Sequence, residues 1–190
     1  MSRQSEISCA CGETAWTIKD NRNGRHLMCY CADCQSFPRH LGQEDRHLDK
    51  DGTRIFQTHP GNVEFTKGAE NLALLRLSPK GTFRWYAKCC NTPIANTMSS
   101  THLPFAGMVL PKDHPDFGRV QTRFFTKYTD EKVKDESVLP AMLSMLARAA
   151  VIRITGGERK APFFTPDDQP VAKPTVLTLE ERNAARAKTN

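Results

Sequence analysis

The seven cysteines are the residues of this sequence with the clearest capacity for chemistry. The chain begins without the apolar segment of a secretory signal, so we expect a cytoplasmic protein whose thiols stay reduced. Clustered thiols in a reducing compartment are typical of a soft metal, usually zinc. The cysteines form three groups, which are Cys9-Ala-Cys11, Cys29-Tyr-Cys31-x-x-Cys34, and the adjacent Cys89 and Cys90.

Cys29, Cys31 and Cys34, called the triplet below, form the candidate catalytic metal site. In an extended segment residues i and i+2 project to the same side, so Cys29 and Cys31 can share one ion. Zinc takes four ligands, and a site with three protein ligands leaves a position for water or substrate. Asp33, His40 or another cysteine could close the site and make the zinc inert. The interpretation that we favour leaves it open to an external thiolate.

Cys9 and Cys11 need further ligands, and Cys89 and Cys90 are the thiols that remain. A zinc ion held by these residues would join the N-terminal strand to a later hairpin, and such structural zinc contributes about 10 kcal/mol or more to folding. Successive side chains of a strand diverge. Either the backbone bends here, or Cys90 alone binds and Cys89 is a buried filler.

Short extended runs bounded by Gly, Pro, Asn and Asp predict a mainly β fold of short antiparallel sheets. The clearest pairing is a hairpin in which residues 72–77 and 82–87 flank a turn that contains Pro79 and Gly81. The other expected strands are 15–18, 25–30, 54–58, 62–66, 105–110 and 120–125.

The composition shifts near residue 131, which predicts a zinc-binding β domain at 1–130 and a C-terminal extension at 131–190. After Ser137 the apolar segment 138–150 predicts a helix. We expect one face of this helix to pack against the sheet, namely the face with Met142, Met145, Leu146 and Ala149.

The remainder of the extension predicts a proline-rich arm and a short terminal helix. Regularly spaced prolines favour an extended arm, which Phe163 and Phe164 would hold against the domain. Thr178 and Glu181 have the spacing of a capping box, so a helix should begin there.

The net charge of +6 would by itself suit an anionic partner. Basic and acidic residues are nearly balanced within both parts of the chain, so we expect no nucleic-acid partner. The mean hydropathy of −0.54 and the lack of a long apolar run exclude a membrane span and a membrane partner. The sequence leaves the oligomeric state open.

Three segments resemble, in the same order, motifs of the glutathione-dependent formaldehyde-activating enzymes. They are CACGETAW at 9–16, CYCADCQSFPRHLG at 29–42 and RWYAKCCNTPI at 84–94. The resemblance implies a zinc-stapled β-tent fold with two Zn²⁺ ions. It assigns Cys9, Cys11 and Cys90 to a structural zinc, and it makes the triplet the ligand set of a catalytic zinc that meets the sulfur of glutathione.

The chain departs from the family pattern in two places. Ala87 stands where the family has the first cysteine of a late CxxC, and Cys89 is additional, so the fourth ligand of the structural zinc could be Cys89. The segment after Cys34 looks longer than usual and adds Arg39 and His40. Arg39 could pair with a glutathione carboxylate, and His40 could move a proton near neutral pH. The extension marks an uncharacterised branch of the family.

The triplet and the resemblance together predict a zinc-dependent carbon–sulfur lyase or adduct-forming enzyme. Its substrates would be a small-molecule thiol such as glutathione and a small electrophile. The alternative is a non-catalytic zinc scaffold that binds a protein partner. Thiol redox chemistry is less favoured, because we expect Cys31-x-x-Cys34 to lack the strand-then-helix setting of a thioredoxin-like pair.

Overall fold

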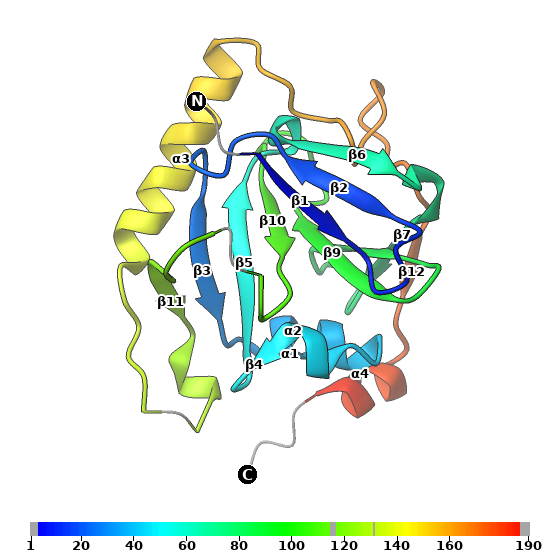
Figure 1. Cartoon of the computed structure of the whole chain (residues 1–190), viewed down its shortest axis with the longest axis vertical. Coiled ribbons are helices and arrows are strands. Elements are labelled where there is room, and N and C mark those ends of the chain that lie inside the picture. The colour runs from blue at the N-terminus through cyan, green and yellow to red at the C-terminus, as the bar shows by residue number, and fades with distance from the viewer. Residues whose placement is uncertain (1–3, 115–116, 131, 187–190) are drawn as a thin grey trace.

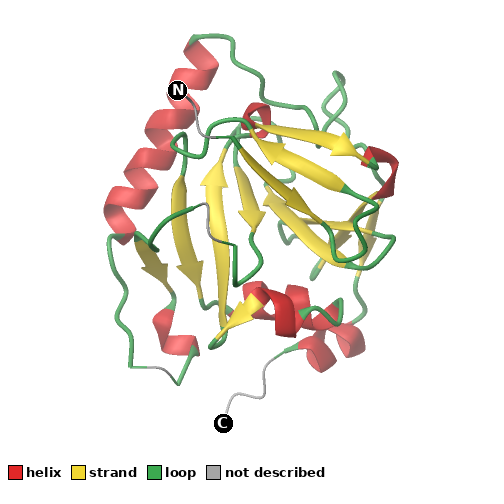
Figure 2. Ribbon diagram, in the orientation of Figure 1, coloured by secondary structure: helices red, strands yellow, loops and turns green. Residues whose placement is uncertain are grey.

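The computed structural model describes residues 4–114, 117–130 and 132–186. These residues form a mainly β structure with antiparallel and mixed sheets and helices toward the C-terminus, as the sequence predicts (Figures 1 and 2). Glu131 and residues 187–190, the two ends of the expected extension, lie outside the described residues. Within the described part of the chain, no helix combines the length and the apolar character needed to cross a membrane.

Twelve strands and four α-helices make up the regular structure of the described residues. The strands are β1 (Ser5–Ser8), β2 (Ala15–Ile18), β3 (Arg25–Cys29), β4 (Leu48–Asp49), β5 (Gly52–Thr58), β6 (Val63–Lys67), β7 (Leu72–Arg76), β8 (Phe83–Ala87), β9 (Thr92–Thr97), β10 (Ala106–Val109), β11 (Thr122–Phe124) and β12 (Pro174–Val176). The helices are α1 (Ala32–His40), α2 (Glu44–His47), α3 (Val138–Ile154) and α4 (Leu179–Ala185), with 3₁₀ turns at Pro60–Asn62, Ala69–Asn71 and Thr126–Tyr128.

The strands form one large sheet and one small sheet. The large sheet has nine strands in the order β11-β3-β5-β10-β9-β8-β7-β12, with β4 paired beside β5. The β11–β3 and β12–β7 pairs are parallel, and the other pairs of the large sheet are antiparallel. The small antiparallel sheet, β1-β2-β6, lies in front of part of the large sheet in Figure 1.

Both faces of the large sheet are covered, and strand β8 shows how its sequence serves both. Because side chains of a strand alternate, Phe83, Trp85 and Ala87 point to one face and join the main core with Trp16 of β2. Tyr86 points to the other face, where Phe37 of α1 packs in a second cluster. Arg84 shares that second face, so this strand carries a cation toward α1.

The predicted hairpin is confirmed, since β7 and β8 pair with Leu72 opposite Ala87. All the other expected strands overlap observed strands, whereas β1, β4, β9 and β12 had not been expected. The segment of β9 contains Pro93 and Asn96, residue types that are depleted in strands, which is why the pattern missed it.

The expected helix in the extension forms, but its predicted inner face is only partly right, since Ala149 is buried whereas Met142 and Leu146 are not. Met142 and Leu146 are 50% and 51% exposed. The buried positions are Ala141, Ala149 and Ile152. Two of these are alanines, so the close approach of α3 to the sheet leaves no room for the longer side chains, which turn to solvent.

The proline-rich arm is held as predicted, because Phe163 and Phe164 are buried in the main core. Past the arm, β12 pairs with β7, and Leu177 joins the cluster around Phe37. The capping box at Thr178 is confirmed and starts α4, which packs against α1. The C-terminal segment therefore contributes to the clusters on both faces of the large sheet.

Truncation of Phe163 tests whether the arm is part of the core. Phe163 is fully buried and its ring lies 5.3 Å from that of Trp85. Phe163→Ala should lower the free energy of unfolding by about 3–5 kcal/mol, because it leaves a cavity among aromatic rings. Leu139→Ala, at a residue that is 66% exposed, is the control and should change it by less than about 0.5 kcal/mol. Urea denaturation measures both, and equal effects would contradict the assignment.

Candidate metal centres

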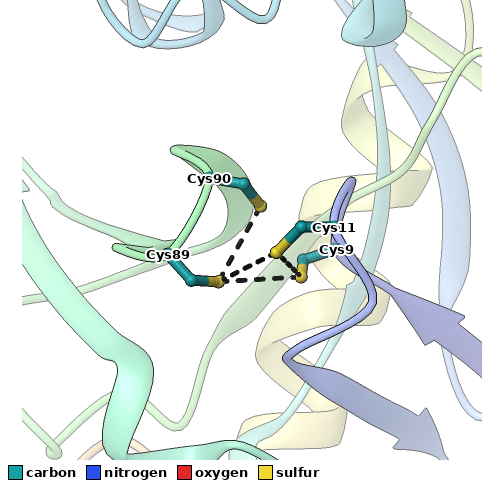
Figure 3. Close-up of side chains that lie close together, drawn as sticks. All are labelled: Cys9, Cys11, Cys89 and Cys90. Atoms are coloured by element: carbon teal, nitrogen blue, oxygen red, sulfur yellow. Dashed lines mark hydrogen bonds between the residues drawn. The ribbon is translucent and has the colours of Figure 1, made fainter.

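Cys9, Cys11, Cys89 and Cys90, called the tetrad below, form one compact group of sulfur atoms (Figure 3). All four sulfurs lie within 4.8 Å of one another. The separations between neighbouring sulfurs are 3.5 to 3.8 Å. A tetrahedral zinc site with Zn–S bonds near 2.3 Å has sulfur–sulfur edges of about 3.8 Å, so the donor set fits one zinc ion. All seven cysteines of the protein are free thiols.

The backbone bends at Cys89 and Cys90, which answers the question of how adjacent cysteines can face one point. They lie in the turn between β8 and β9, where Asn91 takes a left-handed conformation with φ of 57°. Strand alternation does not apply to such a turn. Cys89 is exposed, so the interpretation of Cys89 as a buried filler is wrong.

The loop that carries Cys9 and Cys11 is a tight turn closed by Gly12. The backbone N–H of Gly12 donates to the carbonyl of Cys9 at 3.1 Å, and its φ of 74° is a conformation that glycine adopts without strain. The backbone N–H of Thr14 donates to the sulfur of Cys9 at 3.3 Å. Such donors outside the ligand set orient thiolates for metal binding.

The pKa values of the tetrad show that its sulfurs compete for negative charge. Burial works to raise the pKa of Cys90, but hydrogen bonds with Thr92 and Cys11 outweigh it and lower that pKa to about 6. A backbone hydrogen bond from Glu13 favours the thiolate of Cys11. Burial and the neighbouring sulfurs of Cys90 and Cys89 nevertheless raise its pKa to about 12. The four sulfurs therefore do not all ionise without a cation between them.

The triplet is the second group whose sulfurs converge, again within 4.8 Å of one another. Cys29 ends β3, Cys31 is the N-cap residue of α1, and Cys34 lies in the first turn of that helix. Cys29 and Cys34 are buried, whereas Cys31 is partly exposed. No fourth His, Cys, Asp or Glu among the described residues belongs to this group. The triplet fits a metal ion with one position left for another ligand.

The elements around the triplet fix the positions of its sulfurs. The hydroxyl of Thr53 in β5 donates to the carbonyl of Cys34 at 2.8 Å, and Thr53 also pairs with Cys29 across the β3–β5 ladder. The N-terminus of α1 carries the positive end of the helix dipole, which stabilises thiolates near Cys31. Strand β5 therefore helps to fix the geometry of the site, and the N-terminus of α1 contributes positive charge to it.

Arg84 is a candidate functional residue that the sequence pattern did not predict. It is 5% exposed, and its Nη1 donates to the sulfur of Cys34 at 3.7 Å and to Oδ1 of Asn96 at 2.9 Å. Burial alone would lower the pKa of Arg84, but the nearby Cys34 outweighs burial and raises it. An arginine in a strand of otherwise apolar and aromatic residues, FRWYA, was the available signal.

The pKa values of the triplet indicate a single shared negative charge in the absence of metal. Hydrogen bonds from Cys29 and Cys31, together with the charge of Arg84, hold the pKa of Cys34 well below its usual value. Hydrogen bonds with Cys31 and Cys34 and burial raise the pKa of Cys29 well above its usual value. A hydrogen bond with Cys29 favours the thiolate of Cys31, yet Cys34 and burial raise its pKa to about 12.

His40 and Arg39 are not brought to the triplet. His40 is the last residue of α1, and it lies about 9 Å along the helix axis from Cys34. It lies toward Glu181 of α4, where hydrogen bonds from Thr178 are the main cause of the lowered pKa of that carboxyl. Arg39 donates to Gln35 at 2.9 Å and pairs with Asp51 at 3.0 Å. Asp33 is also outside the group.

The expectation that Cys31-x-x-Cys34 lacks a strand-then-helix setting is wrong. The pair follows β3 directly, and its second cysteine lies in the first turn of α1. The sequence did not predict α1 because the helix contains Pro38 and because its N-cap residue, Cys31, accepts no side-chain capping hydrogen bond. Thiol redox chemistry therefore becomes the second candidate function.

Comparisons with known proteins identify a family but no activity. The family described as "Family of unknown function (DUF6151)" matches residues 1–173. A crystal structure of a Rhodobacter sphaeroides protein is similar over 61% of this chain and 97% of its own length, with 19% sequence identity and a TM-score of 0.40. That likeness is too weak to carry an argument. No curated protein matches the sequence.

Replacing Cys89 tests whether the tetrad uses all four sulfurs. We expect about two zinc ions per chain in the purified protein and about one in Cys89→Ser, because the tetrad, unlike the largely buried triplet, is open to solvent and would no longer enclose an ion without its fourth sulfur. The melting temperature should fall as well, since the ion joins segments far apart in sequence. Metal analysis and thermal unfolding measure both. Cys34→Ser is the matched control and should lose about one ion with a smaller fall in melting temperature. Full metal content in Cys89→Ser would exclude Cys89 as a ligand.

The pKa values of the triplet predict that metal uptake is strongly pH-dependent. Near pH 7.5 Cys29 and Cys31 keep their protons in the metal-free triplet, because the pKa of Cys29 lies well above the usual value of a thiol and that of Cys31 is about 12, whereas the lowered pKa of Cys34 makes it the first of the three to ionise. Zinc must then displace about two protons, so affinity should rise about 100-fold per pH unit toward higher pH. Calorimetry in buffers of different ionisation enthalpy counts these protons. Uptake without proton release would contradict the charge assignment.

Proposed function

The chain belongs to the DUF6151 family, whose function is unknown, and we propose that it is a zinc-dependent enzyme that makes or breaks a carbon–sulfur bond at the triplet. The substrates are a small-molecule thiol such as glutathione and a small electrophile. The resemblance of residues 9–94 to the glutathione-dependent formaldehyde-activating enzymes supports this reaction class. The reaction requires reduced cysteines, in keeping with the cytoplasmic location that we propose.

The observation that carries the proposal is the incomplete ligand set of the triplet. Three sulfurs converge, and no His, Cys, Asp or Glu of the described residues completes a fourth position beside them. A zinc ion in such a site lowers the pKa of a thiol that binds it and holds the resulting thiolate beside an electrophile. A purely structural site would be closed by four protein ligands.

The residues of the chain divide the work between binding and charge. Cys29 and Cys34 are buried and would hold the metal from the protein side, whereas Cys31 is partly exposed and would face an incoming ligand. Arg84 places a positive charge against Cys34. The tetrad joins the β1–β2 loop to the β8–β9 turn and would hold a structural zinc.

Two other functions compete with this proposal. A non-catalytic scaffold that binds a protein partner would use the same fold, but it does not account for an open triplet beside a buried cation. Thiol redox chemistry is favoured by the position of Cys31 and Cys34 at the start of α1 after β3. The third sulfur, Cys29, lies 3.5 Å from Cys31 and favours a metal site over a simple dithiol.

X-ray absorption of the zinc-loaded protein tests the open site. The average number of sulfur ligands per zinc should be about 3.5 in buffer, since one site has four and the other three, and should rise to about 4 with glutathione. Cys34→Ser should abolish this rise, whereas Asp33→Asn, the matched control beside it, should leave it intact. An average of 4 without added thiol would support the scaffold and exclude the enzyme.

Turnover is the second half of this test. Zinc-loaded wild type with glutathione and a panel of small aldehydes should form the carbon–sulfur adduct faster than the uncatalysed reaction, and Cys34→Ser should not. If the purified protein instead carries no metal at the triplet and forms a reversible Cys31–Cys34 disulfide, the redox function replaces the one proposed.

A further inference from the structure

Arg84 is a buried cation that has no carboxylate partner among the described residues. None of the ion pairs within the described part of the chain includes it. Its hydrogen-bond acceptors are the neutral amide of Asn96 and the sulfur of Cys34. A guanidinium remains protonated at any pH that a protein tolerates, and an unpaired buried charge is strongly destabilising. The negative charge in direct contact with Arg84 is therefore that of the triplet, through the sulfur of Cys34.

The surroundings of Arg84 leave its guanidinium little freedom. Its Cζ lies 5.6 Å from the centre of the Phe37 ring, in a cation–π contact with α1. Asn96 faces it directly across the β8–β9 ladder. Asp33, half-buried beside Cys34 in sequence, adds negative charge from farther away. These contacts hold the cation at the sulfur of Cys34.

The position of Arg84 changes the net charge of the metal-loaded site. Among the groups in contact at the site, three thiolates and one divalent ion would carry one net negative charge, and Arg84 would bring that sum to zero. Asp33 is not in this count, because it forms no ion pair with Arg84. An anionic fourth ligand would then change the net charge of the site from zero to −1. Without Arg84, the same ligand would change the net charge from −1 to −2, which costs more free energy in a site of low dielectric.

We infer that Arg84 is a positioning residue that balances the charge of the metal-loaded triplet and so allows an anionic sulfur, rather than only a neutral ligand, to take the fourth position. This inference rests on the proposed function and deepens it. The incoming thiol gives its proton to solvent, and its sulfur binds as a thiolate. The guanidinium does not transfer a proton and makes no covalent bond.

Cobalt-loaded protein gives a readout that does not depend on turnover. Absorption changes follow two added probes, 2-mercaptoethanol, which binds as an anion through sulfur, and imidazole, which binds neutral through nitrogen. Arg84→Gln should weaken binding of the thiolate about 30-fold, because one partner of a buried charge pair is lost. Binding of imidazole should change by less than about threefold, and Arg84→Lys should restore most of the thiolate affinity.

Asn96→Asp is a second variant that keeps Arg84 in place. It sets a carboxylate against the guanidinium with almost no change of shape, so the cation is cancelled and thiolate binding should weaken as in Arg84→Gln. Arg76→Gln is the matched control. Arg76 stacks 4.7 Å from the Phe83 ring and donates to the carbonyl of Pro79, with no contact to a thiol, so this variant should behave as wild type.

The outcomes separate this inference from the proposed function. If Arg84→Gln and Asn96→Asp weaken the binding of 2-mercaptoethanol and of imidazole equally, or weaken the binding of neither, Arg84 is structural and the inference is overturned. If neither probe changes the spectrum of wild type, the proposed function fails. The role of Arg84 is then tested by the affinity of the triplet for cobalt. The ion bound at the triplet is identified as the one that wild type binds and Cys34→Ser does not. The affinity for cobalt should fall in Arg84→Gln and in Asn96→Asp and stay unchanged in Arg76→Gln. Equal affinities in wild type and all three variants would overturn the inference.

Discussion

Repulsion between closely spaced thiolates is the constraint on which the arrangement of this protein depends. Sulfurs 3.5 to 3.8 Å apart cannot all be ionised unless positive charge lies among them. The raised pKa values of Cys11, Cys29 and Cys31 are the direct expression of this conflict. A divalent cation would resolve it at both centres, since both groups of sulfurs converge closely enough to hold one. At the tetrad such an ion would also cross-link segments that lie far apart in the chain.

The two centres resolve the conflict in different ways because they lie in different surroundings. The tetrad lies at loops with two exposed sulfurs, where solvent screens the charge that four thiolates leave over. The triplet is largely buried, and the fold supplies protein charge there, from the start of α1 and from Arg84. A buried site with a protein cation beside it, such as the triplet, is suited to binding an anionic ligand from solvent. An exposed site such as the tetrad is suited to a structural role.

Local patterns predicted much of the fold and the two groups of cysteines whose sulfurs converge. The hairpin, the capping box at Thr178 and the two cysteine groups follow from residues close in sequence or of one rare type. Features set by distant partners were not predictable. Arg84 reaches Cys34 across 50 positions of sequence, and α1 was hidden by Pro38. The inner face of α3 depends on how closely the helix approaches the sheet, which hydrophobic periodicity alone does not record.

The spacing of the cysteines in the sequence means that the triplet is complete earlier in synthesis than the tetrad. Cys29, Cys31 and Cys34 leave the ribosome almost together, so metal capture there closes only short loops. Cys9 and Cys89 are 80 positions apart, and the tetrad must wait for nearly half of the chain and a far longer loop closure. The triplet is thus synthesised before β8 exists, and an ion bound there would meet the guanidinium of Arg84 only after residue 84 has been added and β8 has paired into the sheet.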